Sequence, residues 1–305
     1  MKQFLGIEIG GTKLQLVLGD DRGAIQRRCR LTVQPARGAA GIREAIQTHL
    51  PELLQDASPA AVGVGFGGPV DAQTGQVCCS HQIAGWEDFP LRAWLEELTR
   101  RPAAVENDAN VAALGEAHHG AGQGYDPVFY VTLGSGVGGG LVVGGRIYHG
   151  AKPGEAEIGH VRLDRRGVVV EQRCSGWAVD ARIRRLKDEG VASVLTERIG
   201  PTPGGEARHL RAALDQHDAA AQRILQDTAA DLAFALSHVV HLLHPAAVVL
   251  GGGLALVGEP LRAAVAEALS GWVMKAFAPG PPILLSRLRE DAVPVGCLRL
   301  AGQRL

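Results

Sequence analysis

Apolar and polar residues alternate in two short stretches at the start of the chain, FLGIEI over residues 4–9 and LQLVLGD over 14–20. Such alternation predicts β-strands, because successive side chains of a strand point to opposite faces of a sheet. The glycines between the two stretches predict a turn. The chain is therefore expected to begin with a strand, a glycine turn and a second strand.

The same arrangement returns in VFYVTLGSGVGGGLVV, residues 128–143. The two glycine hairpins are about 125 residues apart, which is near the length of one domain. A third glycine group follows the apolar run AVVL, and the next segment, EPLRAAVAEALSGWV, has helical spacing instead. The repeated hairpin predicts two related lobes with a cleft between them.

Longer stretches with the helical period lie between these landmarks. They predict helices over residues 39–54, 91–100, 109–119, 176–189 and 218–243, and VGVGF (62–66) is typical of a core strand. Hairpins mixed with crossover helices indicate the α/β class.

Composition narrows the class of protein. The chain has 305 residues, of which 46% are hydrophobic and 21% charged, as in globular proteins. Its 31 basic and 32 acidic residues leave a net charge of −1, so we expect no nucleic-acid partner. The first apolar stretch is short and contains Glu8, which argues against a signal peptide or a membrane span and favours a cytoplasmic location. Five cysteines without CxxC spacing predict reduced thiols.

Two glycine motifs resemble nucleotide-binding signatures in their letters. GIEIGGTK (6–13) lacks the order of a P-loop and is followed by a strand, whereas a P-loop needs a helix to complete the phosphate cradle. Gly134, Gly136 and Gly139 fit GxGxxG, but β-like residues follow them too. Both motifs therefore predict hairpin turns.

Glycine turns also let main-chain amides approach an anion, because no Cβ stands in the way. Thr12 adds a hydroxyl and Lys13 a cation, unless Lys13 only begins a strand on its solvent face. A single glycine turn of this kind can be explained by the need to reverse the chain direction between two strands. Three glycine groups at strand ends favour a ligand site.

The polar run Glu106, Asn107, Asp108 and Asn110 lies where a short strand is expected to lead into a helix, with Asn107 or Asp108 near the cap. Helix capping by Asp108 or Asn110 explains one of these residues but not the whole run. A carboxylate held at such a junction can bind a polyol and accept a proton from its hydroxyl.

A second polar group comprises Glu157 and His160 in GEAEIGHV, with Glu171 shortly before SGW. A Glu/His pair is often a metal ligand set, but suitably spaced cysteines are missing, which argues against zinc. Hydrogen bonding to a small polar ligand fits these residues better.

Taken together, these motifs resemble the sugar kinases of the ROK family (repressors, open reading frames, kinases), within the actin/hexokinase-like ATPase superfamily. The resemblance spans nearly the whole chain, and ENDANVAALGE followed closely by LGSGVGGG is its most specific part. Its pieces are GIEIGGTK, FGGPVD (66–71), GWEDFPL (85–91), ENDANVAALGE (106–116), LGSGVGGGLVVGGRIYHG (133–150), EIGH (157–160) and VVLGGG (248–253).

The resemblance implies two RNase-H-like lobes that close over ATP and a sugar. The N-terminal lobe would comprise residues 1–110 with a C-terminal helix at 293–305, and the C-terminal lobe residues 111–292. It further implies a homodimer that uses ATP with Mg²⁺.

The resemblance also assigns roles to residues, with Asp108 as the general base. The residues implied to hold the sugar are Gly68, Asn107, Asp108, Glu157, His160 and Glu171. Those implied to hold the nucleotide phosphates are Gly10, Gly11, Thr12, Lys13, Gly134, Ser135, Gly136 and Gly138, with Gly251, Gly252 and Gly253 beside the adenosine.

Three departures from the family pattern stand out. Glu8 replaces the usual Asp, and we expect it to reach magnesium through water. The family's CxCGxxGC zinc motif is missing, since VRLDRRGVVVEQRCSG contains only Cys174, so we predict no structural zinc. Gln82 in QIAGW replaces the usual Asn of the sugar loop, which leaves the sugar open.

The expected activity is ATP-dependent phosphorylation of a hexose or an N-acetylhexosamine, at the 6-hydroxyl. The alternative is a non-catalytic sugar-binding protein or a sugar-responsive regulator. Because the first glycine hairpin starts within ten residues of Met1, such a regulator is expected to have no DNA-binding domain of its own.

Overall fold

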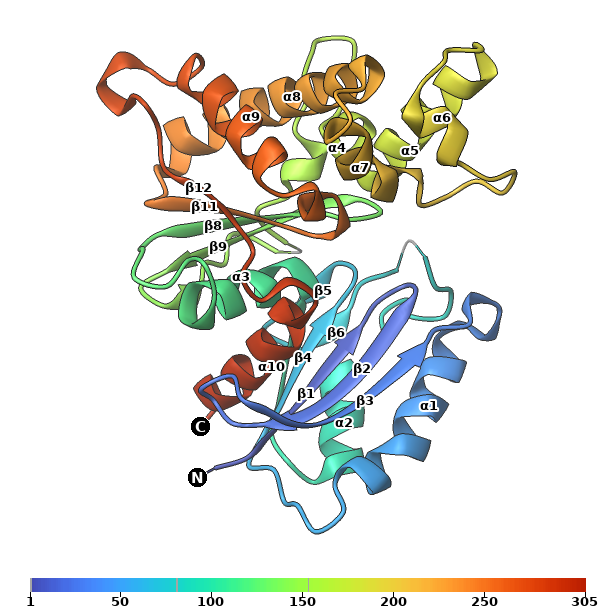
Figure 1. The fold of residues 1–305 in the computed structure, drawn as a ribbon. Coiled ribbons are helices and arrows are strands. Elements are labelled where there is room, and N and C mark those ends of the chain that lie inside the picture. Colours follow the sequence, from blue (N-terminus) through green and yellow to red (C-terminus); the bar gives the residue numbers. More distant parts are fainter. Residues whose placement is uncertain (1, 81, 153) are drawn as a thin grey trace. The chain divides into compact units, whose positions relative to one another are not determined.

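Two five-stranded sheets with the same strand order organise the chain (Figure 1). The computed structural model describes residues 2–80, 82–152 and 154–305. It divides into unit 1, residues 1–124, 140–155 and 287–305, and unit 2, residues 125–139 and 156–286.

The first sheet has the order β3-β2-β1-β4-β7. Its strands are β1 (Phe4–Ile9), β2 (Lys13–Gly19), β3 (Ile25–Thr32), β4 (Val62–Phe66) and β7 (Ala103–Asn107). The first three strands pair antiparallel, whereas β4 and β7 run parallel to β1. β1 and β4 are buried throughout, as their nearly continuous apolar sequences require.

Helices cover both faces of this sheet in unit 1. On one face, α1 (Gly38–Leu53) and α2 (Leu91–Thr99) bury their apolar stripes in the main core. On the other face, α10 (Ala292–Gln303) packs on β1 and β4 and contacts α3 (Asp108–His119) (Figure 1). The short strands β5 (Val70–Asp71) and β6 (Gln76–Val77) form a separate antiparallel pair.

The second sheet has the order β10-β9-β8-β11-β12, which repeats the pattern of the first. Its strands are β8 (Val128–Leu133), β9 (Val137–Val143), β10 (Arg146–Ile147), β11 (Ala247–Gly251) and β12 (Ile283–Leu285). As in the first sheet, two parallel strands complete it: β11 runs parallel to β8, and β12 runs parallel to β11. The two glycine hairpins therefore occupy equivalent places, β1–β2 and β8–β9, as the sequence predicted.

The remaining helices belong to unit 2. They are α4 (Glu171–Cys174), α5 (Gly176–Asp188), α6 (Val194–Arg198), α7 (Leu210–Leu214), α8 (Ala219–Leu243) and α9 (Glu259–Ser270). α8 and α9 pack together, and α9 contacts β12 (Figure 1). The third glycine group leads through a 3-10 helix, η4 (Gly253–Val257), into α9, so the predicted helix after it is confirmed.

The division of the chain differs from the expected lobe boundary near residue 110. α3 lies wholly in unit 1 because it packs closely on α10: a Cβ on Gly115 would overlap the carbonyl oxygen of Ala292. Residues 140–155 also join unit 1, where Gly140 lies against Ala113 of α3. The C-terminal helix expected at 293–305 is α10 of unit 1.

Among the residues that the structure describes, we found no helix with the length and hydropathy needed to cross a bilayer.

Candidate active site

In unit 1, three neighbouring parallel strands end at the same level. Ile9 of β1 pairs with Phe66 of β4, which pairs with Asn107 of β7. The segments that leave these strands therefore emerge side by side. Ligands of α/β sheets characteristically bind at this carboxyl edge.

Asn107 and Asp108 occupy the junction of β7 and α3. Oδ1 of Asn107 accepts hydrogen bonds from the backbone N–H groups of Ala109 (2.8 Å) and Asn110 (3.4 Å), so Asn107 is the helix cap. Its Nδ2 donates to the carbonyl oxygen of Gly68 (3.2 Å), which ties the cap to the segment after β4. Of the two residues expected near the cap, Asn107 and Asp108, the capping residue is therefore Asn107.

Asp108 faces the glycine segments of the neighbouring strands. Its Oδ1 accepts from the N–H of Ala109 (2.8 Å). A Cβ placed on Gly67 would lie 3.4 Å from Oδ2 of Asp108 and 3.6 Å from Cα of Gly10. The carboxylate, the first glycine turn and the Gly67–Gly68 segment are thus neighbours within unit 1. This juxtaposition suits a carboxylate that must reach a hydroxyl next to a phosphate.

Neighbouring atoms leave little room for a side chain in the first glycine turn. The N–H of Gly10 donates to the carbonyl oxygen of Lys13 (2.9 Å), which closes the β1–β2 turn. A Cβ on Gly11 would overlap the side chain of Gln82. Neither Gly10 nor Gly11 has a positive φ, so close approach and not backbone conformation requires glycine here.

Glu8 is engaged by its own hairpin. It is 8% exposed, and its Oε1 lies 2.9 Å from Nζ of Lys13, while its Oε2 accepts from Nε2 of Gln15 (2.7 Å). Lys13 therefore neither lies on a purely solvent face nor offers its full charge to a phosphate. The ion pair explains why a carboxylate is tolerated in this buried position.

In unit 2, the other expected sugar-binding residues gather at the β8–β9 hairpin. Oε2 of Glu171 accepts from the N–H of Val137 (2.9 Å), and a Cβ on Gly136 would overlap that carboxylate. The 3-10 helix η2 (Ile158–His160) packs on the same strand, because a Cβ on Gly159 would overlap the carbonyl oxygen of Val137. The N–H of His160 donates to the carbonyl oxygen of Glu157 (3.0 Å).

A cavity of about 500 Å³ in unit 2 brings together two of the predicted glycine groups. Gly134 and Ser135 of the hairpin line it together with Gly253 after β11. Gly252 precedes it with φ +81°, and a Cβ there would lie 2.6 Å from the backbone of Leu133, so this position requires glycine for both space and conformation.

The rest of this cavity was missed by the sequence analysis. Trp177, Leu254 and Leu256 supply much of its apolar lining. Asp180 fixes its rim, because its carboxylate accepts from the N–H groups of Gly205 (2.9 Å) and Ala207 (2.6 Å). Trp177 is 62% exposed and Leu256 64% exposed. The signal available in the sequence was the position of these apolar residues beside glycines, Trp177 after Gly176 and Leu254 after Gly253.

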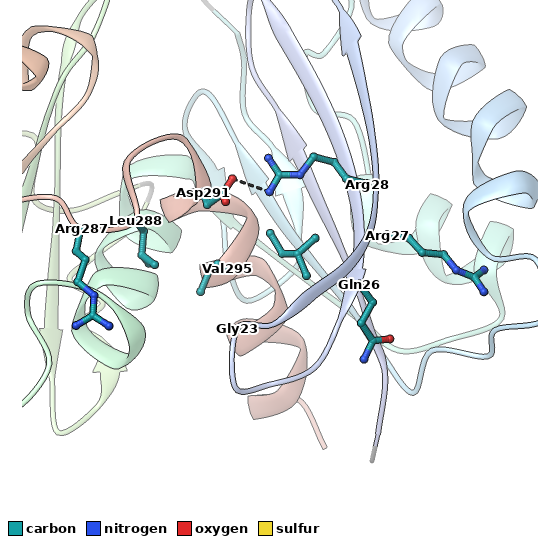
Figure 2. A pocket seen from close by; sticks show the side chains of 9 residues that line it. Gly23, Gln26, Arg27, Arg28, Arg287, Leu288, Asp291 and Val295 are labelled. Atoms are coloured by element: carbon teal, nitrogen blue, oxygen red, sulfur yellow. Dashed lines mark ion pairs between the residues drawn. The ribbon is translucent and has the colours of Figure 1, made fainter.

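A second cavity, of about 540 Å³, lies in unit 1 beside β3 and α10. Arg28 and Asp291 form an ion pair there (2.7 Å), and Arg27 points away from that pair (Figure 2). None of the predicted site residues lines this cavity. The candidate active site therefore does not include this cavity.

Cys174 is a buried structural residue. Its Sγ lies 3.7 Å from the carbonyl oxygen of Thr228, and burial raises the pKa of the thiol to about 12. The five cysteines are free thiols, as predicted. Neither Cys174 nor His160 belongs to the group of three potential metal ligands found among the described residues, Glu106, His149 and Glu155.

Two sheets of one repeated order, each with a glycine turn in its first hairpin, define the RNase-H-like class of the actin/hexokinase-like ATPases. The polar residues beside both turns match the motifs of one branch of that class. The chain belongs to the ROK family, whose family model matches residues 4–304.

Several relatives resemble the chain over nearly its full length. A protein named glucokinase from Halalkalibacterium halodurans is 30% identical, covering 96% of this chain and 93% of the relative. Another glucokinase, from Thermotoga maritima, is 29% identical over 99% of this chain and 98% of its own length. Among solved structures, the ROK glucokinase of Streptomyces griseus in complex with glucose and AMPPNP is 30% identical, covers 99% of both chains and has a TM-score of 0.86.

Proposed function

We propose that this ROK family member is an ATP-dependent sugar kinase that phosphorylates a hexose or an N-acetylhexosamine at the 6-hydroxyl. The observation that carries the proposal is the position of Asp108, at the joined ends of β1, β4 and β7 and beside the first glycine turn. The relatives named glucokinase support the substrate class.

Asp108 acts as the general base. Its carboxylate takes the proton from the sugar hydroxyl as that oxygen attacks the γ-phosphorus of ATP, and ADP leaves. Asn107 holds a neighbouring sugar hydroxyl, and its bond to the carbonyl oxygen of Gly68 fixes its amide. Glu157, His160 and Glu171 bind the remaining hydroxyls, with the carboxylate of Glu171 oriented by the N–H of Val137.

The nucleotide occupies the cavity of unit 2. Its adenosine lies beside Gly253, against the apolar side chains of Trp177 and Leu256. Backbone amides of the turns Gly134–Gly138 and Gly10–Thr12 hold the phosphates, apart from the N–H groups of Gly134 and Gly10, which donate to carbonyl oxygens within their own turns. Backbone N–H groups suit this task because they are fixed before the substrate arrives.

Magnesium bound with ATP would supply positive charge beside the phosphates. Glu8 would hold this ion through water. Lys13 occupies one lone pair of Oε1 of Glu8, and Gln15 occupies one lone pair of Oε2. Each oxygen has a second lone pair, which can accept a hydrogen bond from a magnesium-bound water.

The direct test is ADP release from Mg-ATP in the presence of glucose, mannose, fructose, N-acetylglucosamine or N-acetylmannosamine. We expect turnover with at least one of these sugars and a phosphorylated 6-hydroxyl in its product. If every sugar binds without ADP release, the chain is a sugar-binding protein, which is the alternative that the sequence left open. If none binds, the sugar-kinase proposal is wrong.

Trp177→Ala tests the nucleotide site. Stacking of a base on an aromatic side chain is worth ~1–3 kcal/mol, so the KM for ATP should rise by about 10-fold while the KM for the sugar changes little. Trp272→Ala is the matched control, because Trp272 is 52% exposed and does not line the cavity. Equal effects of the two substitutions would place the adenosine elsewhere.

The oligomeric state and location belong to the same proposal. The family resemblance implies a homodimer, and the short N-terminal apolar stretch interrupted by Glu8 favours the cytoplasm. Light scattering after size-exclusion chromatography should give twice the chain mass of 32.0 kDa.

A further inference from the structure

One ion-pair bridge of unit 1 has no role in the reaction described so far. His149 follows β10, and each nitrogen of its ring contacts a carboxylate. Nε2 lies 3.1 Å from Oε1 of Glu106, and Nδ1 lies 3.3 Å from Oε1 of Glu155. Because the ring stands between the two carboxylates, the three side chains do not surround a common point where a metal ion could bind. Two acceptors at one ring are typical of a protonated imidazole, whose nitrogens are both donors.

The bridge depends on the positive charge of His149. The side chains of Glu106 and Glu155 are only 9% and 12% exposed, so water screens their mutual repulsion poorly. Hydrogen bonds to Glu106 and Glu155 raise the pKa of His149 to about 10, and the ring is therefore charged at neutral pH. Arg92 is a second positive neighbour of Glu106. Glu155 would lose its cation if the imidazole were removed.

The bridge ties Glu155 to the junction of β7 and α3. Glu106, at one end of the bridge, immediately precedes Asn107 and Asp108. Asn110, in the first turn of α3, donates from its Nδ2 to the same oxygen of Glu155 that His149 contacts, with a distance of 2.5 Å. Glu155 is therefore held from both sides of the junction that carries the proposed base.

The chain passes from unit 1 to unit 2 directly after Glu155. The next residue, Ala156, has φ +58°, a conformation that residues other than glycine rarely adopt and keep only where their surroundings hold them. In unit 2 the carbonyl oxygen of Ala156 accepts from the N–H of Ile158 (2.7 Å), the first residue of η2. In unit 1 the contacts of Glu155 hold the chain. Glu157 lies between these two fixed points.

We propose that His149 is a positioning residue for the sugar, which holds Glu155 and so fixes the start of the segment that carries Glu157 and His160. It acts through Glu155 and not by contact with the sugar. The inference rests on the proposed function, since Glu157 and His160 are sugar ligands in that proposal. Loss of the bridge should weaken sugar binding. ATP binding should not change, because the proposed adenosine cavity is lined by residues of unit 2.

The test compares His149→Ala with the wild type in calorimetric titrations with the five sugars named above, without ATP. We expect the Kd for the accepted sugar to rise at least ~10-fold, while kcat at saturating sugar and the KM for ATP stay within about twofold, as for a loss of uniform sugar binding. Hydrogen exchange should also become faster at the N–H groups of Ile158 and His160, because the start of their segment is released.

His118→Ala is the matched control. It removes another histidine contact of unit 1, from Nε2 to the carbonyl oxygen of Gly145 (2.8 Å), and should leave the sugar affinity unchanged. Glu155→Gln keeps the size of the side chain and an acceptor for Asn110 but loses the charge. It should weaken sugar binding by a smaller factor than His149→Ala, and it tests the bridge even if His149→Ala does not fold.

The outcomes separate this inference from the kinase proposal. If the wild type binds a sugar without releasing ADP, the kinase proposal fails, and the sugar Kd values still decide the role of His149. Unchanged sugar affinity of His149→Ala and Glu155→Gln would overturn the inference. Faster exchange with unchanged sugar affinity would overturn it too, because the bridge would then be structural only. Equal losses of sugar and ATP affinity would have the same meaning. If the wild type binds no sugar, both proposals are wrong.

Discussion

Asp108→Asn is expected to lower kcat with the accepted sugar by at least ~10²-fold, the lower end of what a positioned general base contributes. Asparagine keeps an oxygen that can accept from the N–H of Ala109, so the start of α3 should retain its geometry. It cannot take a proton from the sugar hydroxyl. Steady-state ADP release measures the loss, and Asp108→Ala should show a loss at least as large.

The KM values and the binding of ATP identify the reason for that loss. ATP is expected to bind Asp108→Asn as it binds the wild type, because the proposed adenosine cavity is lined by residues of unit 2 alone. Glu259→Gln is the matched control: it removes a carboxylate from the first turn of another helix, α9, and should leave kcat unchanged. Undiminished turnover of Asp108→Asn would remove Asp108 from the role of base.

Local pattern accounts for what could be predicted from the sequence. The alternation in FLGIEI and LQLVLG and the period of the helices depend only on which side chains face the core, and the predicted bounds lie within a few residues of the observed ones. The polar run at the end of β7 could also be predicted to lie at a strand–helix junction, because polar side chains are favoured where they can cap the start of a helix.

Contacts between distant segments account for what could not be predicted. The ion pair of Glu8 and Lys13 follows from the register of β1 and β2, which the letters alone do not give. Trp177 and Leu256 line one cavity with the hairpin because of where the fold places α5 and η4. The contact of His149 with Glu106 likewise joins segments more than 40 positions apart. Such meetings are decided by tertiary packing and not by local propensity.

The boundary of the first lobe shows the same limit. The family resemblance implied a boundary near residue 110, whereas α3 stays with unit 1. The reason is the contact of α3 with α10, in which Gly115 of α3 and Gly296 of α10 each leave room for backbone atoms of the other helix. Neither glycine stood out in the sequence, because each lies within an apolar helical pattern.

Gly296→Ala should therefore be strongly destabilising. A Cβ on Gly296 would overlap the carbonyl oxygen of Val111 and lie 2.8 Å from its Cγ1, and backbone of α3 cannot yield as a flexible side chain can. Overpacking of this kind costs ~1–3 kcal/mol or more, whereas alanine gains only about 1 kcal/mol in helix propensity over glycine. The clash outweighs the gain. We expect a lower urea midpoint, and a lower kcat as well, because α3 carries Asp108 at its first position.

Gly41→Ala in α1 is the comparison, because a Cβ there would meet a side chain and not the backbone of a second helix. It would lie 2.5 Å from Cβ of Arg37, so the residue at the start of α1 must shift, but no other element stands in the way. Part of that cost is offset by the helix propensity of alanine, so Gly41→Ala should lose less stability than Gly296→Ala. If Gly296→Ala were as stable as Gly41→Ala, the two helices would not approach as closely as the structure has them. In that case the packing of α10 would not be what holds α3, and with it Asp108, in place.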